Sequence, residues 1–314
     1  GLRLMRVASR LFLAAMVLMV GASGCGDDES GRATTAADLA ASPAGGAAMA
    51  PLRAAIGVSE AYACALKDDG GIACWGVPAV AALNAPPGQF VALAAGATHA
   101  CGLRPEGTVA CWGDLGEKPP AGSFTAVSAG LDYTCAIKSD RALACWGNGW
   151  EGKTAAPAGT FAQVTAGDSH ACGVRTDGTV ACWGRQNDGR ASPPSGTFAS
   201  VSAGGRHTCG IRADATLVCW GQSDDSRTQA PAGEFVAVSA GLNSSCAIRR
   251  DGTLACWGNN GNNKASPPGG TYVAVAVGSG HACAIAVDGR ASCWGDSSDG
   301  RTKATTVRFA SATK

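Results

Sequence analysis

The residues with the widest range of chemistry in this chain are its cysteines, which can form disulfides, hold a metal ion or act as redox thiols. The chain has 314 residues, and 15 of them are Cys. Seven of these begin a Cys-Trp-Gly triplet, and each has a second Cys ten positions earlier. The pairs are Cys64 with Cys74, Cys101 with Cys111, Cys135 with Cys145, Cys172 with Cys182, Cys209 with Cys219, Cys246 with Cys256 and Cys283 with Cys293. Only Cys25 is left over.

The spacing of these cysteines favours disulfides over the alternatives. Zinc sites commonly place Cys residues about two to four positions apart with a second cluster nearby, and redox sites use Cys-x-x-Cys. Neither pattern occurs in this sequence. Because disulfides persist in oxidising compartments, this assignment fits an exported protein. We therefore predict one structural disulfide for each pair, and no bound metal.

The four histidines are the next candidates, because imidazoles arranged around a ring could ligate a metal ion. All of them stand two residues before the first Cys of a pair, at His99, His170, His207 and His281. The other three pairs have Tyr62, Tyr133 and Ser244 there. Since Tyr and Ser are poor zinc ligands, we interpret this position as one hydrogen-bonding side chain at the mouth of each repeat. We expect no cofactor.

Two periodic sets of basic residues could bind an anion if their charges were free. The first set is Lys153, Arg190, Arg227, Lys264 and Arg301. The second set is Lys67, Arg104, Lys138, Arg175, Arg212 and Arg249. An acidic residue lies two positions before four members of the first set and two positions after every member of the second. Compensated charges usually belong to solvated loops, so we interpret both sets as self-paired surface residues.

Signals for catalysis are weak. Asp168, Ser169 and His170 have the composition of a catalytic triad, but neighbours on an extended chain point in opposite directions. Acidic loops such as residues 296–300 lack the dense oxygen ligands of a strong calcium site. We expect no enzyme, and the alternative is a carbohydrate- or metal-binding enzyme that uses the histidines or the acidic loops.

The elements that position these residues recur with the cysteine pairs, at spacings of 37 residues except for one of 34. One unit reads as three strands, over residues 198–203, 207–212 and 217–220. Most copies have Asp-Gly or Glu-Gly between the second and third strands, which is a hairpin signal. Repeats of this length with three or four strands are typical of propeller blades. The sequence therefore predicts an all-β, seven-bladed β-propeller with one disulfide inside each blade.

Period-two geometry explains the residue types on these strands. His207, Cys209 and Ile211 face one side, and the other side of this strand holds only Ala, Gly, Ser or Thr in all seven copies. Trp220 then faces the small side chains, as tight packing between neighbouring blades requires. Each disulfide closes a short loop and contributes at most about 2.5–3 kcal/mol in the chain-entropy model.

The pattern Ala-Gly-x-x-His-x-Cys-x-(Ile/Leu/Val)-x-x-Asp-Gly-x-x-x-Cys-Trp-Gly resembles the regulator of chromosome condensation repeat. Its short period is most similar to the bacterial β-lactamase-inhibitor-protein propellers built from that repeat. The resemblance covers residues 52–314 and implies a ring of seven blades. Phe309 lies one period after Tyr272, and residues 53–58 have the matching place at the start. One of these two segments should complete the closing blade, and the sequence leaves open which.

The two residues before the His position differ from blade to blade and should share one face with the long loops between blades. Inhibitor propellers present aromatic residues there, whereas this chain has none at these positions and offers only Trp150 in a long loop. The candidate binding residues are Thr98, Asp132, Trp150, Ser169, Arg206 and Asn243. We expect a non-enzymatic scaffold for a protein or glycan partner, with inhibition of a secreted enzyme as the alternative.

The N-terminal segment indicates where the protein works. Arg3, Arg6 and Arg10 precede an apolar run over residues 11–20, and small residues then lead to Cys25. This is a secretory signal pattern, and its end resembles the lipobox of bacterial lipoproteins. We expect a signal peptide over residues 1–24, a lipidated Cys25 with a flexible tether over 25–51, and the propeller over 52–314.

The composition agrees with an exported monomer that touches the membrane only through its lipid. The formal net charge of the whole chain is +1, which gives no bulk attraction for nucleic acid. With 46% apolar residues the chain can bury a sizeable core. We expect the protein to be anchored in the bacterial envelope, on the periplasmic side or at the cell surface.

Overall fold

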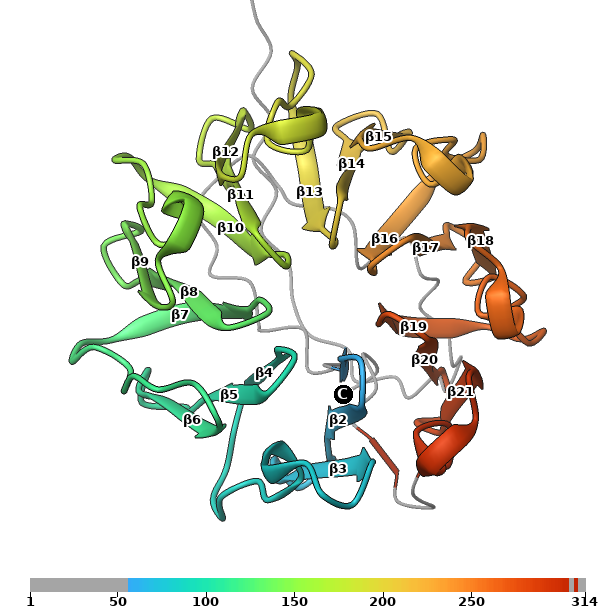
Figure 1. The fold of residues 1–314 in the computed structure, drawn as a ribbon, viewed down its shortest axis with the longest axis horizontal. Coiled ribbons are helices and arrows are strands. Elements are labelled where there is room, and N and C mark those ends of the chain that lie inside the picture. Colours follow the sequence, from blue (N-terminus) through green and yellow to red (C-terminus); the bar gives the residue numbers. More distant parts are fainter. Residues whose placement is uncertain (1–55, 305–307, 310–314) are drawn as a thin grey trace, which may run out of the picture. The chain divides into compact units, whose positions relative to one another are not determined.

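The computed structural model describes residues 56–304 and 308–309. Each repeat folds as a three-stranded antiparallel sheet, and the seven sheets follow one another around a ring, so the chain forms a seven-bladed β-propeller (Figure 1). The predicted fold class is confirmed. The predicted signal peptide, the lipid-bearing Cys25 and the tether over residues 25–51 lie outside the described residues.

The blades use their strands in chain order, from the inner strand outward. Their bounds are β1 Ile56–Val58, β2 Tyr62–Leu66 and β3 Ile72–Gly76; β4 Ala92–Ala95, β5 His99–Leu103 and β6 Val109–Gly113; β7 Phe124–Ala129, β8 Tyr133–Lys138 and β9 Leu143–Gly147; β10 Phe161–Ala166, β11 His170–Arg175 and β12 Val180–Gly184; β13 Phe198–Ala203, β14 His207–Arg212 and β15 Leu217–Gly221; β16 Phe235–Ala240, β17 Ser244–Arg249 and β18 Leu254–Gly258; β19 Tyr272–Val277, β20 His281–Ala286 and β21 Ala291–Gly295.

Short 3-10 helices lie in the long loops that follow the outer strands. They are η2 Ala81–Leu83, η3 Trp150–Gly152, η4 Asn187–Gly189, η5 Asp224–Ser226, η6 Gly261–Asn263 and η7 Ser298–Gly300. In five of them a non-glycine residue has a positive φ, for example Asp188 at 62°. Asp and Asn tolerate this conformation better than most residues. None of the helices in the described part of the chain is long and apolar enough to cross a membrane.

The register of each outer hairpin places the cysteines opposite each other. In the fifth blade Cys209 is opposite Cys219 and Thr208 is opposite Trp220. The other six hairpins repeat this register, and all seven cysteine pairs are bonded. The predicted disulfides, and the prediction that Trp lies on the side of the small residues, are confirmed.

The hydrophobic core is divided among the junctions between blades. Each of seven apolar clusters joins residues from two neighbouring blades. Between the fifth and sixth blades, Cys209 and Ile211 pack against Phe235 and Trp257. One face of each blade therefore buries its Cys and aliphatic residues against the aromatic residues of the next. This arrangement gives every blade two neighbours and leaves no apolar face of the ring without a partner.

Glycines bring the blades close together where the inner strands end. A Cβ on Gly204 would lie 2.2 Å from the carbonyl oxygen of Gly241 in the next blade. The same approach recurs around the ring at distances of 2.1–2.4 Å. The backbone amide of Gly205 donates a hydrogen bond of 3.0 Å to that Gly241 oxygen. The close approach excludes a Cβ at six of the seven blades, which explains the recurrent small residue and glycine there, whereas Ser59 holds this position in the first blade.

Both chain ends contribute to the blade that closes the ring. In a regular blade, Phe198 pairs with Arg212 and Val201 pairs with Gly210. In the first blade, Ile56 takes the place of Val201 by pairing with Ala65, while Phe309 takes the place of Phe198 by pairing with Lys67. The N-terminal segment therefore supplies the inner strand and the C-terminal segment supplies its aromatic residue. The sequence-based expectation that one segment alone completes the blade was wrong, because each segment covers only part of the first-strand position.

Candidate functional site

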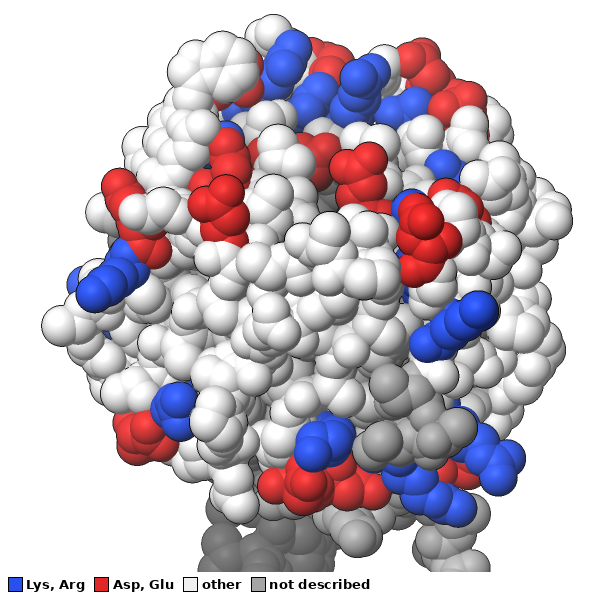
Figure 2. All heavy atoms as spheres, turned by 60° about the horizontal axis from the view of Figure 1, so that its bottom comes forward, with Lys and Arg blue, Asp and Glu red and all other residues white. Residues whose placement is uncertain are grey.

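The variable turns and the long loops lie together on one face of the propeller, as the alternation of strands predicts. We call this the loop face; it consists of the turns between the first and second strands and the loops after the third strands. Asn148 Nδ2 in a long loop donates a hydrogen bond of 2.7 Å to Asp132 Oδ2 in a turn. Thr98 Oγ1 donates one of 2.7 Å to the carbonyl oxygen of Asp114. Figure 2, in which the molecule is turned by 60° from Figure 1, shows acidic side chains above the middle of the view and a group of basic side chains near its upper edge.

The six predicted binding residues divide into two groups. Thr98, Trp150 and Arg206 are exposed. Asp132, Ser169 and Asn243 are half-buried and hold basic side chains of the first periodic set. The structure therefore places all six on the loop face, but three of them support the fold there.

Four of the five basic residues of the first periodic set are buried and Arg301 is half-buried, so the interpretation of this set as solvated loop residues was wrong. Arg190 Nη1 donates hydrogen bonds to Ser169 Oγ at 2.9 Å and to the Gly205 carbonyl oxygen of the next blade at 2.7 Å. Lys264 Nζ makes the same kind of bridge between Asn243 Oδ1 and the Ser279 carbonyl oxygen. These cations are buried because they tie the turns of adjacent blades together. Because these side chains are buried and already bonded, an external anion has little access to them.

Pairing with the acidic residue two positions earlier is confirmed for three members of this set. Arg190 pairs with Asp188, Arg227 with Asp225 and Arg301 with Asp299. Lys153 instead pairs with Asp132, with its Nζ 2.5 Å from Oδ1. The backbone carbonyls of Lys153, Arg227 and Lys264 accept hydrogen bonds from Trp indoles of the following blades. The loops are therefore bonded into the junctions through both side chain and backbone.

The second periodic set also departs from the sequence interpretation. Four of its arginines lie over the Phe ring of their own blade, with the guanidinium carbon 4.9–5.2 Å from the ring centroid. Among the described residues, only Lys67 of this set pairs with the acid that follows it, at 3.0 Å from Asp69. Elsewhere the acid accepts hydrogen bonds within its own turn, as Asp177 does from the amide and hydroxyl of Thr179. Turn bonding therefore replaces the expected ion pairs.

The histidines lie in the junctions and not at the mouths of the blades. All four are fully buried. His170 Nε2 lies 2.7 Å from Thr208 Oγ1 of the next blade, and that hydroxyl donates to the Arg190 carbonyl oxygen. The Thr208 hydroxyl must therefore accept from the imidazole, which places the proton of neutral His170 on Nε2. The sequence interpretation of one hydrogen-bonding side chain per blade holds for five blades but not for Ser244 and His281, whose side chains have no partner among the described residues, and the location was wrong.

The possible triad does not assemble. Ser169 Oγ accepts a hydrogen bond from Arg190, while His170 is bonded to Thr208. Burial lowers the pKa of His170 to about 3, which makes it a poor general base. Burial raises the pKa of Asp168, while Arg190 acts against this shift. Among residues 56–304 and 308–309, no three His, Cys, Asp or Glu side chains gather as a metal site would require.

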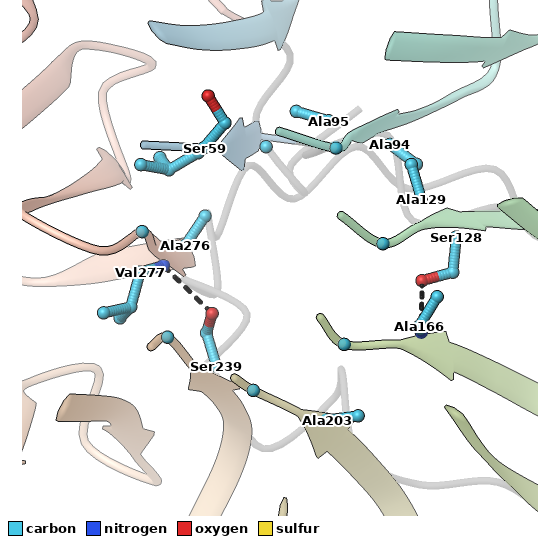
Figure 3. Close-up of a pocket in the computed structure, with 18 of the residues that line it drawn as sticks. Ser59, Ala94, Ala95, Ser128, Ala129, Ala166, Ala203, Ser239, Ala276 and Val277 are labelled. Atoms are coloured by element: carbon cyan, nitrogen blue, oxygen red, sulfur yellow. Dashed lines mark hydrogen bonds between the residues drawn. The ribbon is translucent and has the colours of Figure 1, made fainter. Parts of the chain in front are cut away.

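A hollow of about 340 Å³ lies at the centre of the loop face. Small residues of the inner strands and the adjoining turns line it (Figure 3). Inner-edge amides of several blades donate to a hydroxyl of the preceding blade, as Ala166 does to Ser128 and Val277 does to Ser239. The hydroxyls thereby satisfy backbone groups that an edge strand would otherwise leave open. The sequence argument did not identify this hollow, although the recurrent Ser or Thr near the end of the first strand is its signal.

Comparison with protein families gave one match, which falls on the repeats. The family model described as the regulator of chromosome condensation (RCC1) repeat matches residues 90–115, 161–190, 198–227, 235–264 and 272–301. Five blades therefore match the model of the RCC1 repeat. The matches to RCC1 fall on the second blade and on the fourth to seventh blades. A comparison with curated protein sequences gave no match.

Solved structures similar to this propeller include plant receptor ectodomains. The CRINKLY WD40 ectodomain of the Arabidopsis thaliana receptor kinase ACR4 is 27% identical with a TM-score of 0.68, over 77% of this chain and 94% of that one. The entire ectodomain of the Physcomitrella patens receptor kinase CR4 is 27% identical with a TM-score of 0.66, over 76% and 73%. Prp20p from Saccharomyces cerevisiae is 16% identical with a TM-score of 0.61, over 70% and 75%, and shows the fold alone.

Proposed function

We propose that this protein is a non-enzymatic scaffold that binds a protein partner through its loop face and is tethered to the bacterial envelope by a lipid on Cys25. The proposal is supported by the contrast between polar residues that are buried in the junctions and polar or aromatic residues that are exposed on the loop face. The histidines and most basic residues of the first periodic set are buried in the junctions between blades, where a partner cannot reach them. Exposed residues that differ between blades, such as Trp150 and Arg206, remain on one face.

The comparisons support a binding role without naming the partner. The yeast structure concerns binding of Prp20p to Gsp1p and histones, so a propeller of this fold can serve as a protein-binding surface. Two similar structures are ectodomains, which by definition lie outside the cell. This agrees with an exported propeller carrying seven disulfides.

The test combines substitution of the exposed residues with pull-down from envelope extracts. Trp150→Ala and Arg206→Ala together should weaken partner capture and leave thermal stability unchanged, because neither side chain supports a junction. Asn243→Ala is left out, since Asn243 holds the buried Lys264. Capture that is undiminished in the double variant would count against the loop face.

Tethering is tested separately. A Cys25→Ser variant should lose incorporation of a labelled fatty acid and move from the membrane fraction to the soluble fraction. A chain that stays with the membrane without Cys25 would exclude the lipid anchor. This result would leave the binding role of the loop face intact.

A further inference from the structure

The third blade breaks the repeat with an exposed aromatic residue. Trp150 is 69% exposed at the start of η3. In the four blades that follow, the same repeat position holds Asn187, Asp224, Gly261 and Ser298. Three large apolar side chains are exposed in the described part of the chain, and two of them, Trp150 and Leu131, belong to this blade. An exposed Trp where the repeat has small or polar residues indicates a contact with another molecule.

Hydrogen bonds on one side and an ion pair on the other hold the loop that carries Trp150. The Trp150 amide donates to Asn148 Oδ1 at 3.0 Å, and Asn148 Nδ2 donates to Asp132 Oδ2. On the other side, Glu151 Oε1 lies 3.6 Å from Arg185 Nε. Because Leu131 adjoins Asp132, this chain of bonds sets both apolar residues on one surface. A loop held in this way loses little backbone entropy when a partner binds the aromatic side chain that it carries.

Three acidic residues without a basic partner lie in the loops and turns next to the third blade. Asp114, Glu117 and Asp168 have no basic group within 4.0 Å among the described residues. Glu117 Oε2 accepts a hydrogen bond from the Gly147 amide, which attaches this carboxylate to the third blade. Asp168 lines the central hollow together with Leu131. Lys118 adjoins Glu117, and the charges of Arg190, Arg206 and Lys153 act on Asp168 from a distance, so the carboxylates are compensated only in part.

Several donor groups of this surface are already engaged, although the Trp150 indole and the Lys118 ammonium make no hydrogen bond among the described residues. Lys153 Nζ is bonded to Asp132, Arg185 faces Glu151, and the Asn148 amide group donates to Asp132. The surface therefore offers hydrogen-bond acceptors and apolar area, but few free donors. A sugar hydroxyl both donates and accepts, whereas Lys and Arg side chains only donate. This asymmetry favours a basic peptide segment over a glycan.

We propose that the third-blade patch, formed by Leu131, Trp150, Asp114, Glu117 and Asp168, binds a partner protein segment that presents a Lys or Arg beside an apolar residue. The proposal rests on the proposed function and gives it a partner chemistry. Trp150 and Leu131 pack against the apolar residue, and the carboxylates receive the cation. Attraction of this kind weakens with salt, because exposed charges are screened.

Selection from a phage library of random dodecapeptides tests the proposal with the full-length oxidised chain. Enriched peptides should contain Lys or Arg next to an aliphatic or aromatic residue. Trp150→Ala should weaken a selected peptide about tenfold or more, as expected for a hot-spot residue. Asp168→Asn should weaken it less and flatten its salt dependence. Val287→Ser is the matched control, since Val287 is exposed outside the loop face, beside the turn between β20 and β21, and this variant should bind like the wild type.

The outcomes separate this patch from the loop face as a whole. Enrichment of peptides without basic residues, or unchanged binding by Trp150→Ala, overturns the basic-segment proposal. Peptides that depend on Arg206 and not on Trp150 or Leu131 also overturn it, yet leave the loop face in place. Binding lost only in Val287→Ser contradicts the loop face itself. A Trp150-dependent signal on a neutral glycan array, with no peptide enriched, replaces the peptide with a sugar.

Discussion

Polar residues at the junctions are matched in pairs across neighbouring blades. Where one blade has His, the next blade has a hydroxyl, as in His99 with Thr134 and His207 with Ser245. Where one blade has Tyr133, the next has Ala171, and the Tyr hydroxyl instead donates to the His170 carbonyl oxygen at 2.6 Å. The Tyr ring is larger than the His ring, so the residue opposite it in the next blade is the smaller Ala and not Ser or Thr.

His281 is the exception to this pairing. The corresponding residue of the next blade is Ala63, and neither ring nitrogen of His281 has a partner among the described residues. Ala63→Ser should therefore supply the missing acceptor and stabilise the protein by about 0.5–1.5 kcal/mol, measured as a rise in the urea midpoint. Thr208→Ala makes the opposite change at an intact pair and should cost about 1–3 kcal/mol. A lower midpoint for Ala63→Ser would show that the site has no room for the hydroxyl.

Among the elements, the split first strand of the first blade decides whether the ring stays closed. Phe309 is fully buried, its amide donates to the Gly289 carbonyl oxygen at 2.8 Å, and its ring lies 5.7 Å from the centroid of Trp75. These contacts reproduce those of Phe198 with its own neighbours in an uninterrupted blade. A residue near the C-terminus thus completes a blade whose other strands lie near the start of the propeller.

Phe309→Ala should destabilise the whole propeller and not the last blade alone. Loss of a buried Phe costs about 3–5 kcal/mol, and here it also opens the ring. Chemical denaturation followed by Trp fluorescence measures the loss. The neighbouring exposed Arg308→Ala is the control and should change the midpoint little. Equal midpoints for the two variants would mean that the inner strand β1 closes the ring without Phe309.

At the scale of the whole molecule, four buried neutral histidines make stability depend on pH. Burial lowers the pKa of His99, His207 and His281 to about 4 and that of His170 to about 3, from an ordinary value of 6.5. Between pH 6.5 and 4 the unfolded chain binds protons that the folded chain does not. Stability is therefore unaffected by these groups above pH 6.5 and falls as the pH drops through this window.

The urea midpoint measured between pH 7.5 and about 4.5 should thus decline on the acid side. His281→Ser removes one of the four groups, and Ser244 already fills this repeat position, so the variant should show a shallower decline. Protonation of the turn carboxylates lowers stability only at a lower pH, because hydrogen bonds lower the pKa of Asp177, Asp214 and Asp251 below 3.8. A midpoint that stays constant down to pH 5 would contradict neutral burial of the histidines.

Local patterns were enough to predict the blades from the sequence. The period of 37, the alternation along each strand and the ten-residue spacing of the cysteines all act within one repeat, where neighbours in sequence are neighbours in space. They predicted the three strands, the disulfide and the side on which Trp220 lies. They also predicted that Thr98, Asp132 and the other candidates share a face with the long loops.

Contacts between repeats were decided only by the tertiary structure. Arg190 has an acid two positions away, which reads as a surface pair, yet its guanidinium crosses to Gly205 in the next blade. Likewise the sequence shows His170 and Thr208 as separate repeat positions, and folding joins them over 38 residues. The sequence by itself determined the blade, because its bonds are local. The ring geometry determined which polar residues are buried and which, such as Trp150, remain free to bind.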